Sequence, residues 1–245
     1  MKNSAKHVDI LTKGAKSFGI DLSDDTIASL LLYMEELKAW NKKINLTAIT
    51  QEKEILTKHF LDSIAPAPYL LKGTSVLDLG SGAGLPGIPL KIIRPDLRVT
   101  LLDSSRKKIH FQKHIIRTLK LSEITTVEGR AEDAIKRHPD MLHSYDAVLS
   151  RAFSSLRTFI ELGRPFLKKT GLLITFKGPA GVAELSELKQ WLDQERLPTQ
   201  ISASFRQIGL LFSSNLRKFC LVLTLFRYGH NSRTASWNRS GRCIL

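Results

Sequence analysis

Residues 76–87 read Val76-Leu77-Asp78-Leu79-Gly80-Ser81-Gly82-Ala83-Gly84-Leu85-Pro86-Gly87. An apolar, β-prone run ends at Leu79 and is followed by closely spaced glycines, with Pro86 near the favoured first position of a helix. Residues 82–87 match the pattern G-x-G-x-x-G, in which glycines let the backbone approach a ligand and the helix N-terminus offers unpaired N–H groups. The stretch therefore predicts a strand, a tight turn and a helix that together bind a nucleotide-like cofactor.

From residue 75 onward, short apolar runs of strand length alternate with amphipathic stretches. The runs are residues 75–79, 98–103, 124–128, 145–150 and 172–177. Because the stretches between them fit crossover helices, we expect these runs to form a parallel sheet. Two further strands are expected near residues 201–208 and 218–226, with residues 209–217 linking them as an antiparallel hairpin. The predicted fold is α/β, with seven strands in a mostly parallel sheet.

The first part of the chain has the pattern of amphipathic helices. Residues 5–64 are predicted to be helical, and a separate helical segment is expected at residues 51–63, before Pro66 and Pro68. One helix face is formed by apolar residues three and four positions apart: Ile27, Leu30, Leu31, Met34, Leu37 and Trp40. This region contrasts with the strand-rich sequence that follows it.

The chain is expected to have three regions, which differ in composition. They are an N-terminal helical cap at residues 1–72, a cofactor-binding core at 73–228 and a disordered basic tail at 229–245. The tail is rich in Ser, Arg and Asn, lacks acidic residues and has little to bury.

The composition excludes several classes of protein. The chain has 245 residues, of which 42% are hydrophobic, so it is long enough to bury a core, and it is neither collagen-like nor wholly disordered. It has no apolar run that would span a bilayer and no secretory signal at its start. Its two cysteines, Cys220 and Cys243, build no disulfide framework and have no metal-ligand spacing. We therefore expect a cytoplasmic protein that binds no metal and no membrane. We also expect it to be a monomer.

The formal net charge of +14, from 37 Lys and Arg against 23 Asp and Glu, indicates an anionic partner. The densest basic block is residues 104–120, which contains no carboxylate. On a helix, Arg106, Lys113, Arg117 and Lys120 fall along one stripe. Such a one-sided basic face indicates a nucleic acid or another polyanion, although a solvated helix surface has the same pattern.

Carboxylates at successive strand ends help to choose the cofactor. Asp103 ends the second predicted strand, where a carboxylate can accept hydrogen bonds from both ribose hydroxyls of either NAD or S-adenosylmethionine. Glu132 and Asp133 follow the third predicted strand, and Asp78 directly precedes the glycines. Acid beside the turn disfavours a pyrophosphate and suits a ligand that carries an ammonium and a sulfonium group. The cofactor predicted from these residues is S-adenosylmethionine.

Residues 78–87 resemble the first motif of class I methyltransferases. The longer string at residues 78–96, DLGSGAGLPGIPLKIIRPD, closely resembles the bacterial small-subunit ribosomal RNA guanine-N7 methyltransferases, a family also called glucose-inhibited division protein B. Further matches follow in family order: Asn45–Ile49, His59–Ser63, Leu102–Ser104, Gly129–Glu132, Ser150–Ala152 and Phe176–Gly178. The resemblance implies a Rossmann-like α/β fold with an N-terminal helical cap. Two features depart from the family: Ser105 replaces a frequent Leu, and the tail from Gly229 has no counterpart.

The motifs and the resemblance together define two sets of candidate site residues. Those expected to bind the cofactor are Asp78, Gly80, Gly82, Gly84, Leu85, Asp103, Ser104, Ala131, Glu132 and Arg151. Those expected to bind RNA are Asn45, His59, Arg106, Lys107, Lys108, Arg130 and Lys177. Asn45 and His59 rest chiefly on the family resemblance, since the residues alone indicate a turn residue and a helix-face residue. The basic residues are expected to contact the RNA backbone, where they position the substrate without specifying its sequence.

The resemblance implies methyl transfer to guanine N7 of small-subunit (16S) ribosomal RNA, and the residues are compatible with that reaction. Guanine N7 already presents a lone pair, so its methylation requires alignment and no general base. The chain lacks the Asn/Asp-Pro-Pro-aromatic loop typical of amino-nitrogen methylation, and neither cysteine is placed as a nucleophile. Arg151 is a candidate for positioning a carboxylate or the target base, or alternatively a structural ion pair.

Several other functions remain open on the sequence alone. The same fold would suit a methyltransferase that acts on another RNA or on a small molecule, and the glycine pattern also suits an NAD(P)-dependent oxidoreductase. A non-catalytic RNA-binding protein that assists ribosome assembly is a further alternative.

Overall fold

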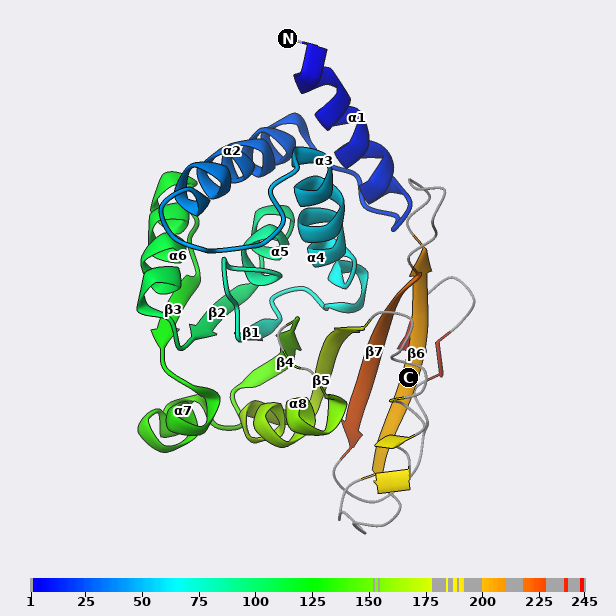
Figure 1. Cartoon of the computed structure of the whole chain (residues 1–245). Coiled ribbons are helices and arrows are strands. Elements are labelled where there is room, and N and C mark those ends of the chain that lie inside the picture. Colours follow the sequence, from blue (N-terminus) through cyan, green and yellow to red (C-terminus); the bar gives the residue numbers. More distant parts are fainter. Residues whose placement is uncertain are drawn as a thin grey trace.

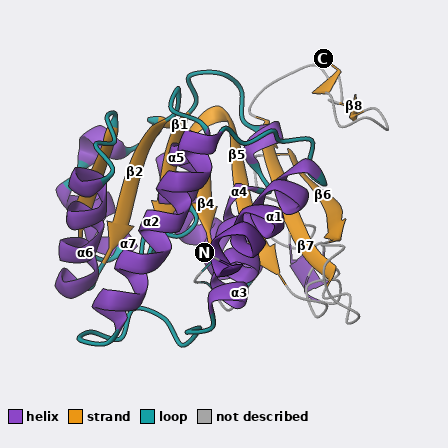
Figure 2. Cartoon of the chain, turned by 90° about the horizontal axis from the view of Figure 1, so that it is seen from above, coloured by secondary structure: helices purple, strands orange, loops and turns teal. Residues whose placement is uncertain are grey.

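The structure is a computed structural model that describes residues 2–151, 153, 155–177, 184, 187–188, 190–191, 200–209, 218–227, 236–237 and 243–244. The described residues build a central sheet with helices on both faces (Figure 1). Helices α2, α5 and α6 cover one face, and α7 and α8 cover the other. Figure 2 looks onto the face that α1, α2 and α5 cover.

The seven strands of the sheet lie in the order β3-β2-β1-β4-β5-β7-β6. Their bounds are β1 Ser75–Leu79, β2 Arg98–Asp103, β3 Ile124–Glu128, β4 Tyr145–Ser150, β5 Leu167–Lys177, β6 Gln200–Gly209 and β7 Lys218–Arg227. The strands β1 to β5 pair in parallel, β7 pairs antiparallel with β5, and β6 pairs antiparallel with β7. The mostly parallel sheet and the antiparallel pair predicted from the sequence are confirmed. The expected connection at residues 209–217 lies, from residue 210 on, outside the described residues.

One strand differs from its predicted bounds by more than one residue. β5 begins at Leu167, before the predicted start at Leu172, because Leu167 pairs with Tyr145 across an irregularity in the β4–β5 register. The first part of β5, between Leu167 and Leu172, was not predicted as a strand because it lacks the apolar residues by which strands are recognised.

The strand order reverses between β1 and β4, and this reversal places the candidate site. Both β2 and β4 pair with β1, so the chain leaves β1 in one direction and later returns to its other side. In open parallel sheets, the carboxyl ends of two such strands diverge and leave a crevice that binds ligands. Gly80, Ser104 and Arg151 each follow the last residue of one of these three strands.

The helices are α1 Lys2–Lys16, α2 Asp24–Asn41, α3 Glu52–Glu54, α4 Asp62–Ile64, α5 Gly87–Ile93, α6 Arg106–Thr118, α7 Ala131–Arg137 and α8 Leu156–Gly163. A π-helix, Ile55–Leu61, joins α3 to α4, and short 3₁₀ turns occupy Ala67–Tyr69, Pro139–Met141 and Arg164–Phe166. Helix α2 begins where the Oγ atom of Ser23 accepts a hydrogen bond from the Thr26 N–H at 3.2 Å, with Asp24 and Asp25 in its first turn.

The helical prediction for residues 5–64 is right in kind, but the segment is interrupted twice. The chain turns at residues 17–23, where Gly19 has a φ of +73°, and leaves helix again from residue 42 to residue 51. The second interruption is the loop that carries Asn45. Glycine favours a positive φ, and the turn at Gly19 therefore ends the first helix.

The N-terminal helices share one hydrophobic core with the sheet. Leu11, Leu30 and Phe60 belong to the same buried cluster as Ile88 of α5 and Leu101 of β2. The helical cap therefore packs directly over the face that carries α5 and α6. The division at residue 72 stays a prediction, as does the character of the tail.

Within the predicted tail, β8 Ser236–Trp237 pairs antiparallel with β9 Cys243–Ile244. Its remaining residues lie outside those the structure describes. No described helix has the length and apolar character needed to cross a membrane.

Candidate functional site

The glycine-rich turn connects β1 to α5 at the carboxyl end of the sheet. Gly80, Gly82 and Gly84 have φ angles of +74°, +59° and +91°, in the left-handed region that favours glycine. The N–H groups of Gly80 and Ser81 both donate to the carbonyl of Leu102 in β2, at 2.8 and 3.0 Å. The turn is thereby tied to the neighbouring strand in a conformation that requires glycine.

The space around the turn differs from one glycine to the next. A Cβ atom on Gly82 would meet nothing within 4 Å, whereas on Gly84 it would lie 2.3 Å from Cδ1 of Ile88. On Gly87 it would lie 2.4 Å from Cδ2 of Leu101. Gly82 therefore borders open space that a ligand can approach. Gly84 lets the turn pack closely on Ile88 of α5, and Gly87 lets α5 pack closely on the sheet. Leu85, the last residue before Pro86, is buried against the core.

Asp78 lies in β1 below the turn and is fully buried. Its Oδ2 atom accepts a hydrogen bond from the Gly87 N–H at 2.8 Å, and its Oδ1 atom has no hydrogen-bond partner among the described residues. Burial raises the pKa of this carboxyl to about 7, although the Gly87 N–H and the Arg151 charge act in the opposite direction. An incompletely satisfied buried carboxyl at this place favours a ligand group that is cationic or donates a hydrogen bond.

Asp103 ends β2 beside the turn and is 7% exposed. One carboxylate oxygen, Oδ2, accepts from the Gly82 N–H at 2.7 Å, and the other, Oδ1, accepts from the Ser105 N–H at 2.8 Å. A carboxylate oxygen can accept more than one hydrogen bond, so both oxygens keep acceptor capacity for a ligand. Ser104 is exposed directly after Asp103.

The end of β3 lies next to Asp103, because the Gly129 N–H donates to the Asp103 carbonyl at 3.0 Å. Arg130 is exposed at the N-cap of α7, Ala131 is buried as its first residue, and Glu132 is exposed in its first turn. The acidic residues predicted to surround the cofactor therefore lie in or shortly after three adjacent strands: Asp78 in β1, Asp103 at the end of β2 and Glu132 after β3.

Arg151 follows β4 and holds the π-helix. Its Nη2 atom donates to the Lys58 carbonyl at 2.6 Å, and Nη1 donates to the His59 carbonyl at 3.2 Å and to Ser63 Oγ at 3.1 Å. Nη2 also lies 4.0 Å from Oδ2 of Asp62. A π-helix displaces backbone carbonyls from the regular α-helical pattern, and such segments occur frequently at functional sites. The end of β4 is thus fixed to the N-terminal cap.

The charge of Arg151 acts on two buried carboxyls. Burial raises the pKa of Asp62 to about 7, as it does for Asp78, and in both cases the guanidinium charge opposes the shift. Burial also lowers the pKa of Arg151 itself, while Asp62 and Asp78 raise it. The three side chains therefore form an electrostatic group that connects the cap to the glycine-rich turn.

His59 does not lie where an RNA-contacting residue should. The side chain is buried, with the residue 7% exposed, and its Nε2 atom lies 2.8 Å from Thr47 Oγ1. Burial and the nearby Arg151 charge lower its pKa to about 4, so the ring is neutral at pH 7. The expectation of RNA contact at His59 is corrected to a structural role, since the ring supports the loop that carries Asn45.

Asn45, by contrast, is exposed, and it lies near the first turn of α6. Asn45 lines one cavity of about 290 Å³ together with Lys107 and Lys108. Arg106, Lys113 and Arg117 are exposed on α6. Lys120 is also exposed but lies beyond the end of the helix at Thr118, with a φ of +51°, so the stripe predicted from the sequence is shorter by one residue. For Lys177, which ends β5, only the backbone is described; its expected contact stays a prediction.

Two residues that hold the turn were not identified from the sequence. The Tyr33 hydroxyl of α2 donates to the Ala83 carbonyl at 2.5 Å, and the Gln112 Nε2 atom of α6 donates to Ser81 Oγ at 2.9 Å and to the Gly82 carbonyl at 2.8 Å. Both side chains are fully buried. Tyr33 sits in an apolar helix face and Gln112 in a basic helix, and neither pattern distinguishes a turn-binding residue from an ordinary one.

Comparison with protein families gives one match over most of the chain. The family model described as "rRNA small subunit methyltransferase G" matches residues 26–207. A ribosomal RNA small subunit methyltransferase G from Alkaliphilus oremlandii is 42% identical over 184 residues, which are 74% of this chain and 77% of the relative. The protein of the same name from Geobacter sp. (strain M21) is 42% identical over 193 residues, 79% of this chain and 87% of the relative.

Solved structures resemble the chain in fold at low sequence identity. A putative S-adenosyl-L-methionine-dependent methyltransferase from Methanococcus maripaludis has a TM-score of 0.52 at 16% identity, covering 79% of this chain and 94% of that chain. A putative transferase from Pyrococcus horikoshii has a TM-score of 0.54 at 11% identity, covering 69% and 63%. These likenesses confirm the predicted Rossmann-like α/β fold.

Proposed function

Because the chain belongs to the family of rRNA small subunit methyltransferase G, we propose that it transfers the methyl group of S-adenosylmethionine to N7 of a guanine in small-subunit (16S) ribosomal RNA. The family resemblance predicted from the sequence is confirmed by these relatives. The observation in the structure that carries the proposal is the glycine-rich turn with a buried carboxyl, Asp78, beneath it and a second, Asp103, beside it.

The residues around the turn fit S-adenosylmethionine better than a dinucleotide. The Oδ1 atom of Asp78 has no partner in the described part of the chain, and Gly82 borders open space. We assign Asp78 to the ammonium of the methionine moiety and Asp103 to the ribose hydroxyls. A pyrophosphate would instead bring further negative charge toward these two carboxyls.

The remaining contacts to the cofactor follow from the position of the strand ends. Gly80, Gly82, Gly84 and Leu85 would line the turn on which the cofactor rests. Ser104, Ala131 and Glu132, at the ends of β2 and β3, would surround its adenosine part. When bound, the cofactor supplies an electrophilic methyl group on a sulfonium.

The protein's part in the reaction is alignment. A guanine presents N7 with a free lone pair, so no side chain needs to remove a proton before the methyl is transferred. Arg151 acts as a positioning residue, since its guanidinium fixes the π-helix against the end of β4. Its direct contact with the cofactor or the base stays a prediction.

The RNA substrate is supported by the basic residues beside the cofactor site. Arg106, Lys107 and Lys108 begin α6 close to Asp103, and Arg130 begins α7. These residues would contact the RNA backbone, whereas Asn45 would contact the strand from the cap. The partner is the ribosomal RNA or the small subunit, and the cytoplasm is the location that this substrate requires. The monomeric state expected from the sequence stays a prediction.

The cofactor is tested by calorimetry of the full chain with S-adenosylmethionine and with NADH. We expect S-adenosylmethionine to bind and NADH not to bind, and Asp103→Ala to lose most of the affinity. Tight NADH binding would contradict the assignment of the cofactor. The substrate is tested by charge reversal at Arg106, Lys107 and Lys108, for which we expect methylation of ribosomal RNA to fall while cofactor affinity stays unchanged.

A further inference from the structure

A cavity at the boundary between the cap and the core is lined by basic residues from two distant parts of the chain. Lys42, Lys43 and Asn45 come from the loop after α2, and Lys107 and Lys108 come from the first turn of α6. The cavity measures about 290 Å³, and Ser105 is also part of its wall. The sequence predicted a role in RNA binding for Asn45, Lys107 and Lys108, but not for Lys42 and Lys43, which line the same cavity.

The lysines of this cavity are not neutralised within the described part of the chain. None of Lys42, Lys43, Lys107 and Lys108 forms an ion pair or a side-chain hydrogen bond there. No acidic residue among those described lines the cavity, and two acids of α2 have other partners, since Glu35 pairs with Lys38 and Glu36 with His114. A cavity whose described wall holds four lysines and no carboxylate favours binding of an anion.

The loop is held in place before any ligand binds. The Asn41 Oδ1 atom accepts from the N–H groups of Leu46 and Thr47, at 2.8 and 3.0 Å, and its Nδ2 atom donates to the Thr47 carbonyl at 3.0 Å. Thr47 Oγ1 accepts from the Ile49 N–H at 3.0 Å and lies 2.8 Å from His59 Nε2. Because the loop is already ordered, it loses little conformational entropy when its exposed side chains bind a ligand.

The cavity lies beside the proposed cofactor site. Ser105 in its wall donates its backbone N–H to Oδ1 of Asp103, whose Oδ2 accepts from the Gly82 N–H of the glycine-rich turn. An anion in the cavity would thus lie next to the methyl donor. Because S-adenosylmethionine carries no phosphate, the anion has to come from the substrate.

We propose that this cavity, formed by residues 42–46 and 105–108, clamps one phosphodiester of the RNA strand adjacent to the base that is methylated. The inference rests on the proposed function and adds to it the role of Lys42 and Lys43. The cap lysines and the α6 lysines grip the same phosphate from two sides, and the Asn45 amide donates a further hydrogen bond. The clamp therefore positions the strand, while the sequence is read elsewhere.

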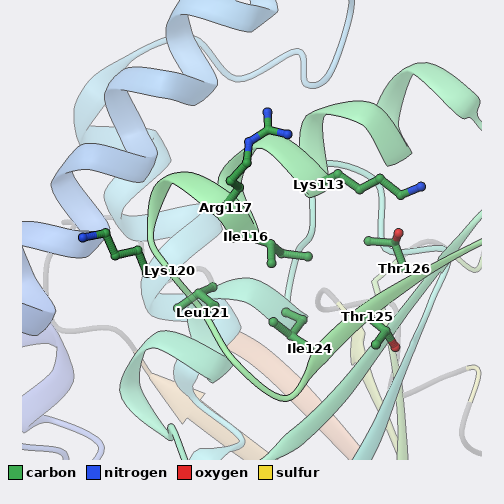
Figure 3. Close-up of a pocket in the computed structure, with 8 residues that line it drawn as sticks. All are labelled: Lys113, Ile116, Arg117, Lys120, Leu121, Ile124, Thr125 and Thr126. Carbon is green, nitrogen blue, oxygen red and sulfur yellow. The ribbon is translucent and has the colours of Figure 1, made fainter.

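A second basic surface provides a matched comparison. A groove of about 560 Å³ near the far end of α6 is lined by Lys113, Arg117 and Lys120 over an apolar floor that includes Ile116 and Ile124 (Figure 3). Its three cations point in different directions, so they cannot close on one phosphate. Neutralising two of them changes the net charge of the chain by the same amount as neutralising Lys107 and Lys108.

The test compares Lys42→Ala/Lys43→Ala, Lys107→Ala/Lys108→Ala, the combined fourfold variant and the control Lys113→Ala/Lys120→Ala. Affinity for unmethylated small ribosomal subunits is measured over a series of salt concentrations. We expect each clamp pair to weaken binding about tenfold, as for loss of charge-assisted hydrogen bonds. Each should reduce the slope of log K against log salt by about 0.7, the value for one single-stranded phosphate.

The fourfold variant shows whether the two lysine pairs contact one phosphate or different phosphates. If both pairs hold one phosphate, the slope lost in the fourfold variant stays near that of either pair alone, because one contact is lost only once. The control pair should weaken binding less than about threefold. Calorimetry with S-adenosylmethionine and the melting temperature should be unchanged in the clamp variants, which excludes unfolding as the cause.

Two results would overturn the clamp alone. One is a slope loss in the fourfold variant equal to the sum of the two pairs, and the other is an equal effect of the control pair. Both would leave the wild-type chain methylating small-subunit RNA. A wild-type chain that neither binds nor methylates small subunits would instead overturn the proposed function, and the clamp with it.

Discussion

The guanidinium of Arg151, directly after β4, donates to the backbone carbonyl of His59 in the π-helix at 3.2 Å. The two residues lie 92 positions apart in the chain. This contact joins the sheet to the N-terminal cap, and the His59 ring carries the connection on to Thr47 and the Asn45 loop. The proposed cofactor site and the proposed RNA-binding loop are therefore parts of one connected structure.

Arg151→Lys tests this connection. A lysine keeps the charge but cannot span the carbonyls of Lys58 and His59 together with Ser63, so we expect a loss of about 2 kcal/mol in the free energy of unfolding. Methyl transfer to the RNA should fall further than cofactor affinity, because the RNA-binding loop shifts. Urea unfolding and calorimetry measure the two effects. Arg117→Lys, at an exposed position on α6, is the control and should change stability by less than about 0.5 kcal/mol.

Asp78→Asn tests the raised pKa of the buried carboxyl. The folded pKa of about 7 lies above the ordinary value of 3.8, so the folded state binds the proton more tightly and stability falls as the pH rises through this interval. The variant lacks this loss. We therefore expect its stability relative to wild type to increase by about 3 kcal/mol between pH 5 and pH 8.

The comparison with wild type is needed because a neighbouring group titrates in the opposite sense. The pKa of His59 is lowered to about 4 from 6.5, so its contribution is present above pH 6.5 and is lost as the pH falls through 4. That contribution is common to both proteins and cancels in the difference. A stability difference between Asp78→Asn and wild type that does not change with pH would show that the Asp78 pKa is ordinary.

Cofactor binding should release protons at pH 6.5. If the ammonium of S-adenosylmethionine pairs with Asp78, binding selects the ionised carboxylate, and a carboxyl with a pKa near 7 must lose its proton. Calorimetry in buffers of different protonation enthalpy measures the number released, which should fall as the pH is raised from about 5.5 to about 7, below the range in which the amino group of the free cofactor titrates. Proton uptake, or a number independent of pH, would contradict the assignment of Asp78 to the ammonium.

Alanine substitutions at two glycines of the turn should affect folding stability and cofactor affinity to different degrees. Gly82→Ala costs about 1 kcal/mol for its left-handed backbone, and its methyl group points into open space where the cofactor would lie. Gly84→Ala has the same backbone cost and also collides with Ile88, so its loss of stability should reach roughly 3 kcal/mol. We expect Gly82→Ala to stay folded and lose at least about tenfold in cofactor affinity. A folded Gly82→Ala with normal affinity would place the cofactor elsewhere.

The strands of the sheet could be predicted from the sequence because parallel strands buried on both faces appear as short apolar runs between helical stretches. The same reasoning placed Gly80, Asp103 and Arg151 at strand ends, where the structure brings them to one edge of the sheet. The π-helix could not be predicted, since its hydrogen-bond pattern has no distinctive residue preference in Ile55–Leu61.

Contacts between elements that lie far apart in the chain also could not be predicted from the sequence. Tyr33 matches an apolar helix face, and only the fold brings its hydroxyl to the Ala83 carbonyl. His59 was expected to contact RNA because it lies in a motif of the family, and the sequence alone does not show that its side chain is buried. Lys42 and Lys43 directly follow the end of α2, where basic residues are common, and the cavity that they share with α6 exists only after folding.

The proposed reaction is measured by methyl transfer from labelled S-adenosylmethionine to small ribosomal subunits that lack the modification, followed by mass spectrometry of the RNA nucleosides. We expect label in 7-methylguanosine of 16S ribosomal RNA, and its loss with Asp103→Ala. Label at another atom, in another RNA or in ribosomal protein, or none in subunits while a folded chain binds the cofactor, would contradict the proposed reaction.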